Sequence, residues 1–407
     1  MIFSEIFVWI YLPNESVPVV AGKITFSSFQ GKKSGHFVYG KSYLSRCNAL
    51  PLNPVSLPLN ECAVMFCDLN GLPGVVADSC PDKWGMRVID RIRGGVADDF
   101  PLGYLLLNDS GRVGNLAFSL SPHESPVELS GRELSLDLLL SAVQDIENNK
   151  PVSDELLLAL HPGTGGARPK CTIRHQDAIW LAKFPSAADG MISIPRLEFA
   201  TMQLAGMCGI HVASTELQKI NDTDICMVKR FDREIVGDVN LRSPLLSARS
   251  VFYDDPGFAQ IGFGSYARLA RWMPRYGCSK DDKRALYKRM VFNVAVRNSD
   301  DHELNHGFVA NKYGAYALSP AYDIVPSLHA NHIHHHALLI GKSAAGTIEN
   351  LLACVQAFDL SVEEARSIIS EVENFIQNNW LDVFYQAGFS DEELRKLETC
   401  FAKIPAY

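Results

Sequence analysis

The sequence R-N-S-D-D-H-E-L-N-H-G-F occupies residues 297–308, and L-S-P-A-Y-D-I-V-P-S follows at residues 318–327. Four residues separate Asp300 from Asn305, and Asp323 comes just after a predicted hairpin. Protein kinases place the same residue types in this way, as H-R-D-x-x-x-x-N followed by D-F-G. There the first aspartate orients the substrate hydroxyl, while the asparagine and the second aspartate bind Mg²⁺. The two stretches therefore predict a site for phosphoryl transfer from ATP, because a chance turn explains them poorly.

A lysine in an apolar strand is the next candidate. Lys183 lies in W-L-A-K-F-P, and Glu198 lies on the helix predicted to follow. A lysine in such a strand is costly without a partner, and a strand lysine paired with a helix glutamate orients the ATP phosphates in kinases. We therefore group Lys183 with Asp300 and His302 as candidate catalytic residues. A lysine that reaches the surface is the alternative.

A glycine-rich loop precedes that strand. Residues 161–170 read H-P-G-T-G-G-A-R-P-K. Glycines allow backbone N–H groups to converge on phosphate oxygens without a Cβ in the way. No G-K-[ST] closes the loop and no βαβ unit surrounds it, so it is neither a Walker A loop nor a dinucleotide-binding fingerprint. A surface turn is the alternative. The candidate phosphate-binding residues are Gly163, Thr164, Gly165, Gly166 and Ala167.

An apolar strand runs into the charged sequence V-K-R-F-D-R at residues 228–233. This pattern suits a connector between two lobes, whose backbone could bond to adenine. Lys229, Phe231 and Asp232 are the candidate cofactor-binding residues there. An ordinary strand end with a solvated ion pair is the alternative.

A histidine cluster follows the second acidic loop. Residues 329–336 read H-A-N-H-I-H-H-H, and imidazoles at such spacing can bind a metal. However, no cysteine partner and no H-E-x-x-H signature accompany them. Strand alternation would place His332, His334 and His336 on one face. A structural role is the favoured interpretation, and a metal or pH-sensing role is the alternative.

Composition limits the classes of protein to consider. The chain has 407 residues, of which 47% are hydrophobic and 21% charged, and its net charge is −8. This length can bury more than one core. The acidic balance argues against a broad nucleic-acid-binding surface on this chain alone.

Cysteine usage and hydropathy bear on location. The ten cysteines include no C-x-x-C pair, which favours reduced thiols in a cytoplasmic protein. The apolar run at the N-terminus is interrupted by Glu5, and no basic residue precedes it. We therefore expect a strand there rather than a signal peptide. No other stretch is long enough to cross a bilayer, so we expect no contact with a membrane.

The first part of the chain is predicted to be rich in strands. Alternating or apolar runs between turn residues predict strands over Ile6–Leu12, Val19–Thr25 and Gly35–Val38. Helical spacing predicts helices near Trp84–Ile92 and Leu134–Asn148. Between these two helices, the segments 100–107 and 113–120 could each form a strand or a helix.

The rest of the chain changes from a small sheet to helices. A hairpin (Cys171–His175 and Ala178–Phe184), a helix (Pro195–Cys208) and two strands (Val212–Lys219 and Ile225–Phe231) are predicted first. Helices are then predicted over Ser279–Arg297, Ser361–Asn379 and Asp391–Ala402. We expect an α+β fold in three segments: residues 1–125, residues 126–233 with the glycine loop, and residues 234–407 with both acidic loops.

Taken in order, these segments resemble the HipA family of bacterial Ser/Thr protein kinase toxins, over most of the chain. Gly71–Arg91 is similar to the N-terminal HipA subdomain, and G-G-A-R-P-K is similar to the family's phosphate loop. A-K-F-P and K-R-F-D-R resemble its ATP lysine strand and connector. S-D-D-H-E-L-N-H-G-F and L-S-P-A-Y-D-I resemble its catalytic and metal-binding loops.

The resemblance implies a role for each matching residue. Asp300 would be the catalytic aspartate, Asn305 and Asp323 the Mg²⁺ ligands, and Lys183 the phosphate lysine. The implied fold is kinase-like and two-lobed, of the phosphoinositide-3-kinase type, with a β-rich N-terminal subdomain and a mainly helical C-terminal lobe. Family members often carry a serine in or near the glycine loop for self-phosphorylation. Thr164 is the only hydroxyl here, which puts that control in doubt.

The resemblance also implies cofactors and partners. ATP and Mg²⁺ would be the cofactors, and a protein would be the substrate, as aminoacyl-tRNA synthetases are for family kinases. A small helix-turn-helix antitoxin of HipB type would be the partner, so that DNA is bound only through it. Two alternatives stay open: a catalytically silent module that binds nucleotide or antitoxin, and a small-molecule kinase.

Overall fold

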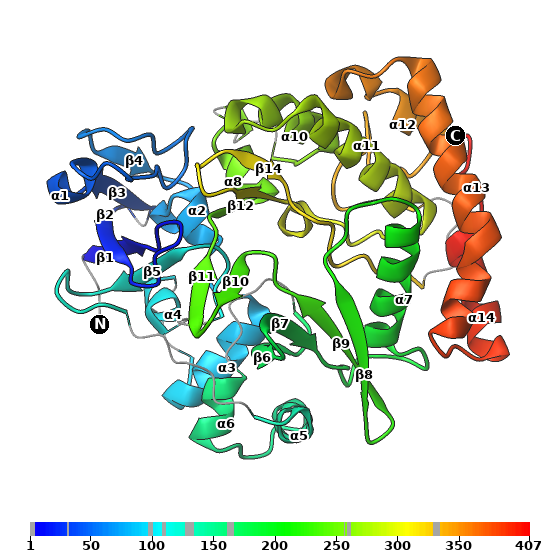
Figure 1. Ribbon diagram of the computed structural model, residues 1–407, viewed down its shortest axis with the longest axis horizontal. Helices are drawn as coiled ribbons and strands as arrows, with labels where there is room; N and C mark the ends of the chain where they lie inside the picture. Colours follow the sequence, from blue (N-terminus) through cyan, green and yellow to red (C-terminus); the bar gives the residue numbers. More distant parts are fainter. Residues whose placement is uncertain are drawn as a thin grey trace. The chain divides into compact units, whose positions relative to one another are not determined.

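The computed structural model describes residues 5–30, 32–96, 101–107, 111–126, 134–160, 167–255, 257–258, 262–328 and 334–407 (Figure 1). The chain forms two compact units. The first contains Met1–Ala187, Lys229–Leu246 and Val309–Ala315, and the second contains Ala188–Val228, Ser247–Phe308 and Tyr316–Tyr407. This partition by compactness does not test the three predicted segments, which stay a prediction.

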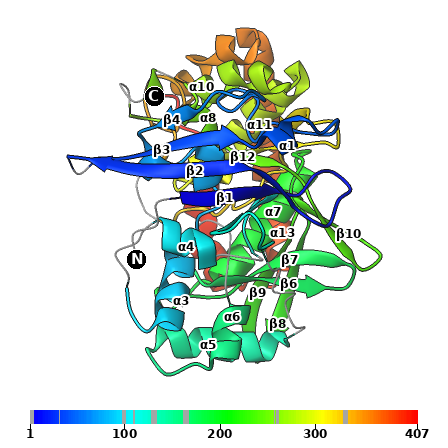
Figure 2. The ribbon, with the colours of Figure 1, turned by 90° about the vertical axis from the view of Figure 1, so that its left-hand side faces the viewer.

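The first unit contains a five-stranded antiparallel sheet in the order β4-β3-β2-β1-β5. Figure 2 shows four of its strands, β4, β3, β2 and β1. Its strands are β1 (Glu5–Ile10), β2 (Val19–Phe29), β3 (Lys32–Tyr39), β4 (Val64–Phe66) and β5 (Leu116–Ser119). Alternation of buried side chains explains the strands, since Ile6 and Val8 of β1 and Ile24 of β2 are fully buried. Gly22 permits the close approach of β3, because a Cβ there would lie 2.3 Å from the carbonyl oxygen of Val38.

Helices and hairpins complete the first unit. Its helices are α1 (Lys41–Leu44), α2 (Gly74–Ala77), α3 (Lys83–Arg93), α4 (Leu102–Leu107), α5 (Leu136–Glu147) and α6 (Asp154–Ala159), with a 3₁₀ turn, η1 (Leu69–Gly71). Its hairpins pair β6 (Lys170–His175) with β7 (Ala178–Lys183), and β10 (Arg233–Val236) with β11 (Val239–Arg242). The Asp82 side chain caps α3, and Gly94 ends it with a positive φ of 74°.

The second unit is mainly helical. Its α-helices are α7 (Ile194–Met207), α8 (Ala248–Tyr253), α10 (Tyr266–Trp272), α11 (Lys280–Ala295), α12 (Ile348–Leu352), α13 (Val362–Gln386) and α14 (Asp391–Leu397). The 3₁₀ turns are η2 (Met273–Tyr276), η3 (Glu303–Asn305), η4 (Val355–Phe358) and η5 (Glu398–Phe401). The remaining strands are β8 (Thr215–Ile220), β9 (Thr223–Lys229), β12 (Leu245–Ser247), β13 (Gly307–Ala310) and β14 (Tyr316–Leu318), of which β9, β12 and β13 cross a boundary between the units.

The core of the second unit lies where α13 packs against α11 and α7 (Figure 1). Leu286, Met290 and Val291 of α11 are fully buried, and Val372 and Phe384 of α13 are fully buried too. These residues recur at helical spacing, so one apolar face of each helix is removed from water.

Most predicted elements are present, and the differences have local causes. Helix α13 runs to Gln386, past its predicted end at residue 379, because Trp380 and Phe384 continue the buried face and no glycine interrupts it before Gly388. Helix α14 ends at Leu397, where η5 begins. The open segment 100–107 contains helix α4, and 113–120 contains strand β5.

The strand predicted over Ile225–Phe231 ends at Lys229, and β10 and β11 follow as an additional hairpin. The strand predicted over Val212–Lys219 begins only at Thr215, since Val212 instead makes an isolated parallel bridge with Ala321.

Two expectations from composition can be compared with the structure. All ten cysteines lie in described residues, and none forms a disulfide bond. Within the same described ranges, no helix is both long enough and apolar enough to span a membrane.

Candidate functional site

Helix α11 carries the chain into the first acidic loop. Ser279 and Asp282 form a reciprocal capping box at its N-terminus. At its other end, Arg297 adopts a positive φ of 55°, which turns the chain out of the helix. The residues that follow therefore begin from a fixed point in the core of the second unit.

The first acidic loop separates two neighbouring aspartates by environment. Asp300 is exposed, whereas Asp301 is only 2% exposed. The Asn305 side-chain nitrogen donates to the Asp300 carbonyl oxygen at 3.4 Å, which leaves its amide oxygen as the remaining ligand atom. His302 Nδ1 accepts from the Leu304 N–H at 3.2 Å and caps η3. The loop is thus held from inside while Asp300 faces solvent.

Asp301 is the internal anchor of this loop. Its Oδ1 lies 2.8 Å from Nε2 of His306, and its Oδ2 accepts a short hydrogen bond from the Tyr266 hydroxyl. Burial by itself would raise the pKa of Asp301. The charge of His306 and the hydrogen bonds from both partners outweigh burial and hold that pKa below its ordinary value. Asp301 therefore stays ionised inside the unit.

A chain of buried amides extends from this anchor. The Asn293 side-chain nitrogen donates to the Tyr266 hydroxyl oxygen at 3.0 Å, and Asn298 donates to the Asn293 side-chain oxygen at 3.2 Å. His336 Nδ1 lies 2.9 Å from the Asn298 carbonyl oxygen. Burial lowers the pKa of His336 below its ordinary value, so this imidazole is neutral and Nδ1 donates.

The second acidic loop is attached directly to the first. The Tyr322 hydroxyl donates to the Leu304 carbonyl oxygen at 2.9 Å, and the Ser327 N–H donates to the Arg297 carbonyl oxygen at 3.0 Å. Ser299 and Ser327 also share a short hydroxyl–hydroxyl hydrogen bond. The structure therefore brings together the two stretches that the sequence pattern had associated.

The backbone at Asp323 is unusual. It has a positive φ of 59°, which is uncommon for any residue other than glycine. Such backbone conformations persist where the surrounding structure fixes them, and they concentrate at functional sites. Two residues earlier, the Ala321 N–H donates to the His211 carbonyl oxygen at 2.8 Å, and the Ala213 N–H donates to the Ala321 carbonyl oxygen at 2.9 Å. These two hydrogen bonds fix the backbone at Ala321, and so the position of the chain just before Asp323.

The predicted metal ligands fit Mg²⁺ by their chemistry. Asn305 and Asp323 offer one amide oxygen and one carboxylate, and Mg²⁺ takes hard oxygen ligands while it keeps several waters. Across the described part of the chain, no group of three His, Cys, Asp or Glu residues forms a metal cluster. The donor set thus fits a partly hydrated Mg²⁺ held with a substrate phosphate, rather than a closed protein cage.

The candidate residues outside the two acidic loops differ in burial and in the unit to which they belong. Lys183 ends β7 and is partly buried, whereas Glu198 belongs to the second unit and is 3% exposed. Their pairing stays a prediction. Residues Gly163–Gly166 of the glycine loop lie outside the described residues, and Ala167 is exposed.

The segment after the glycine loop is anchored to the N-terminal part of the first unit. Lys170 pairs with Asp82 at 2.9 Å, and both side chains are buried. The Trp84 indole N–H also donates to the Lys170 carbonyl oxygen at 2.9 Å. The segment that resembles the HipA N-terminal subdomain therefore fixes the exit of the glycine loop.

Asp232, a candidate cofactor-binding residue in the connector, is held in place by its neighbours. The Asp232 carboxylate is buried and accepts from Arg230 at 2.7 Å, Arg233 at 2.8 Å and the Gly114 N–H at 2.8 Å. Burial would raise its pKa, but the two guanidinium groups outweigh burial and hold that pKa well below its ordinary value. Lys229 by contrast is exposed at the end of β9.

The histidine cluster alternates in burial. His334 and His336 are buried and His335 is exposed, as the expected alternation required. His329 and His332 lie outside the described residues.

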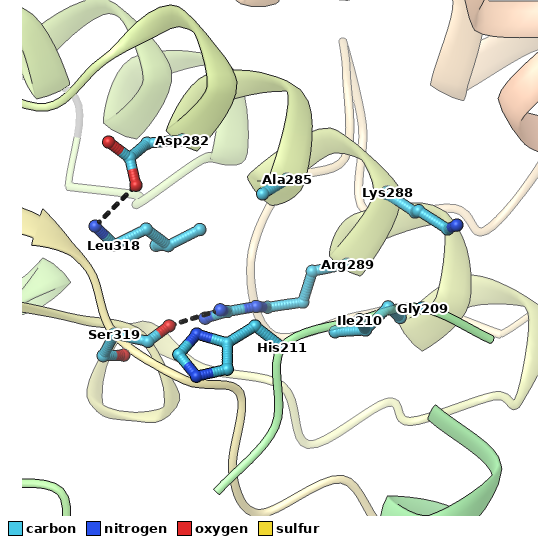
Figure 3. A pocket seen from close by; sticks show the side chains of 9 residues that line it. All are labelled: Gly209, Ile210, His211, Asp282, Ala285, Lys288, Arg289, Leu318 and Ser319. Atoms are coloured by element: carbon cyan, nitrogen blue, oxygen red, sulfur yellow. Dashed lines mark hydrogen bonds between the residues drawn. The ribbon is translucent and has the colours of Figure 1, made fainter. Parts of the chain in front are cut away.

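One further feature had no signal in the sequence pattern. Arg289 of α11 is only 3% exposed and lines a cavity of about 90 Å³ (Figure 3). The cavity is lined by Gly209, Ile210, His211, Asp282, Ala285, Lys288, Arg289, Leu318 and Ser319. From the sequence alone, Lys288 and Arg289 would be expected on the exposed face of the helix. Only the structure shows that other residues enclose Arg289.

Known proteins match this chain at three levels. The model of the HipA-like C-terminal domain matches residues 163–380, more than half of the chain. The candidate kinase Y4dM of Sinorhizobium fredii is 26% identical over 178 residues, which cover 41% of this chain and 39% of that protein. The chain therefore matches less than half of that relative's length.

Solved structures extend the comparison to the fold. HipA of Shewanella oneidensis MR-1, from a complex with HipB and operator DNA, has a TM-score of 0.68 at 15% identity, over 97% of this chain and 96% of that chain. This match confirms the predicted α+β, two-lobed, kinase-like fold. The Helicobacter pylori proinflammatory kinase CtkA matches 59% of this chain and 90% of its own, at 16% identity and a TM-score of 0.41. That score is too low to establish a shared fold.

Proposed function

The chain belongs to the family of proteins with a HipA-like C-terminal domain, and from that membership we propose that it is an ATP- and Mg²⁺-dependent Ser/Thr protein kinase. The observation that carries the proposal is the arrangement of the two acidic loops. Asp300 is exposed on a loop that its neighbour Asp301 anchors, and the Tyr322–Leu304 and Ser327–Arg297 hydrogen bonds attach the loop of Asp323 to it.

Each side chain has a defined task in this proposal. Asp300 would orient the substrate hydroxyl and accept its proton. Asn305 and Asp323 would hold Mg²⁺, which supplies positive charge at the phosphates when bound. Lys183 and the backbone amides of residues 163–167 would add donors along the phosphates.

The proposal extends to partners. The HipA chain of the Shewanella structure is in a complex with HipB and operator DNA, and a HipB-like helix-turn-helix antitoxin is the proposed partner here. The net charge of −8 supports a division of labour in which the antitoxin contacts DNA. The chain would then act in the cytoplasm as the toxin of such a pair, on a protein substrate of the aminoacyl-tRNA synthetase class.

Incubation with γ-labelled ATP, Mg²⁺ and cell lysate tests the activity. Wild type should label a protein band, whereas Asp323→Asn should need more Mg²⁺–ATP to reach the same rate because it loses a charged ligand. Absence of any label would favour the silent binding module, and label only in a metabolite would favour a small-molecule kinase. Equal rates at all Mg²⁺–ATP concentrations would remove Asp323 from the site.

A further inference from the structure

Arg289 carries a buried positive charge that the described residues only partly satisfy. Its Nη2 donates to the Ser319 carbonyl oxygen at 2.5 Å. Among the described residues, none accepts a hydrogen bond from its Nε or its Nη1. A guanidinium has five N–H donors, and a buried charge without a partner is strongly destabilising. Something absent from the chain itself is therefore expected to accept from Arg289.

Space for such a partner lies directly beside it. The cavity of about 90 Å³ has room for ordered waters or for one small ion. Figure 3 shows the Arg289 side chain extending across the cavity between His211 and Ser319. Every residue that lines the cavity belongs to the second unit, so its geometry does not depend on the position of the first.

The nearby carboxylates already accept hydrogen bonds from other groups. Asp282 lines the cavity, but its Oδ1 accepts from the Leu318 N–H at 3.0 Å and its Oδ2 accepts from the Ser279 N–H at 2.7 Å. No carboxylate oxygen of the described residues forms an ion pair with Arg289. Asp301, the other acidic residue close enough to interact with Arg289, is bound to His306 and Tyr266.

The other charged groups at the cavity largely balance one another, which leaves Arg289 as the group that would attract an anion. Lys288 adds a second cation, although Glu371 pairs with it at 2.7 Å. The free donors at the cavity thus belong to a guanidinium, which binds tetrahedral oxyanions through charge-assisted hydrogen bonds.

We propose that this cavity is a binding site for a small tetrahedral oxyanion of the phosphate or sulfate class, held by Nε and Nη1 of Arg289. None of the proposed kinase residues that the structure describes lines this cavity, so phosphate binding there does not require their activity. Its occupant would contact the arginine that already holds the carbonyl oxygen of Ser319, four residues before Asp323 in the sequence.

Inorganic phosphate is the probe for this proposal. Binding is measured by calorimetry with the full chain in chloride buffer at constant ionic strength, without Mg²⁺. Wild type should bind one phosphate saturably. Ala285→Leu places a larger side chain at the exposed rim of the cavity and should weaken the affinity by roughly tenfold or more. Ala353→Leu adds the same atoms at an exposed position outside the cavity and should leave the affinity unchanged.

A competition arm separates this site from a nucleotide site. Phosphate titrated into protein saturated with a non-hydrolysable ATP analogue should still bind with the wild-type affinity. Loss of phosphate binding under these conditions, or equal affinity in wild type and Ala285→Leu, would overturn the assignment. Absence of saturable binding in wild type would show that water fills the cavity, and would overturn it too. Arg289→Met, if it folds, should abolish binding.

Discussion

Asp232 in the connector and Asp301 in the first acidic loop are both buried aspartates, and they are held in different ways. Asp232 faces two guanidinium groups and a backbone N–H, whereas Asp301 faces one imidazole and one phenol. Guanidinium groups surround the first, and the second lies between one imidazole ring and one phenol hydroxyl. The comparison teaches that the connector is fixed by charge, while the loop beside Asp300 is fixed by a directional network.

The largest effect on stability is expected from Asp232→Ala. It would leave Arg230 and Arg233 buried without their carboxylate, which costs about 3–5 kcal/mol when one partner of a buried pair is removed. Denaturant unfolding measures the change, and Asp238→Ala at an exposed position of the β10–β11 turn is the control. A loss no larger than the control's would show that the arginines bind other groups equally well.

The pH dependence of this effect has a fixed sign. The pKa of Asp232 in the folded protein lies well below the ordinary 3.8, so its stabilisation is present at any pH above that value. The stabilisation is lost progressively as the pH falls from the ordinary pKa towards the lower, folded-state pKa. The difference between wild type and Asp232→Ala should therefore be constant from neutral pH down to about pH 5 and shrink below it.

A smaller loss of stability is expected from Asp301→Asn. The amide oxygen still accepts from one of the two donors, His306 or Tyr266, but the N–H₂ group faces the other, at a cost of about 1–3 kcal/mol. Asp300→Asn, one residue earlier, is the matched control: it should change stability by less than about 0.5 kcal/mol, while kinase activity falls about 10²–10⁴-fold. The comparison would fail if the two variants lost the same amount of stability.

The smallest effect is expected at His336 and depends on pH. Burial lowers its pKa below the ordinary 6.5, so the unfolded chain binds the proton first as the pH falls. Folding stability should then decrease below about pH 6.5, by at most about 1.4 kcal/mol per pH unit from this group. His336→Gln should remove that part of the slope, whereas His123→Gln, at an exposed position, should not. Identical slopes in all three proteins would place the titration elsewhere.

The sequence predicted those features that local pattern controls. The spacing of Asp300, Asn305 and Asp323 identified two loops that the structure joins, and helix α11 (Lys280–Ala295) lies within the helix predicted over Ser279–Arg297. Strand β9 was extended too far, because Arg230 and Asp232 turn into contacts with residues 111–114 that lie far away in the sequence.

Long-range partners explain the features that were missed. The anchoring role of Asp301 was missed, since its partner Tyr266 lies in helix α10, 35 residues earlier in the sequence. The burial of Arg289 depends on Ser319 and on residues 209–211, which no periodic pattern connects to α11. Sequence spacing reports which residues share a face, but it does not report which charged residue will be enclosed by other segments.

The backbone hydrogen bonds from residues 337 and 338 have a consequence for hydrogen exchange. The Ala337 N–H donates to the Ser299 carbonyl oxygen at 3.0 Å, and the Leu338 N–H donates to the Asp301 carbonyl oxygen at 3.2 Å. Local openings expose amides in proportion to the free energy of each opening. Here an opening of the acidic loop would also have to release the segment that contains His336. These two amides should therefore exchange with deuterium at the rate set by global unfolding of the second unit, although the loop itself carries the exposed Asp300.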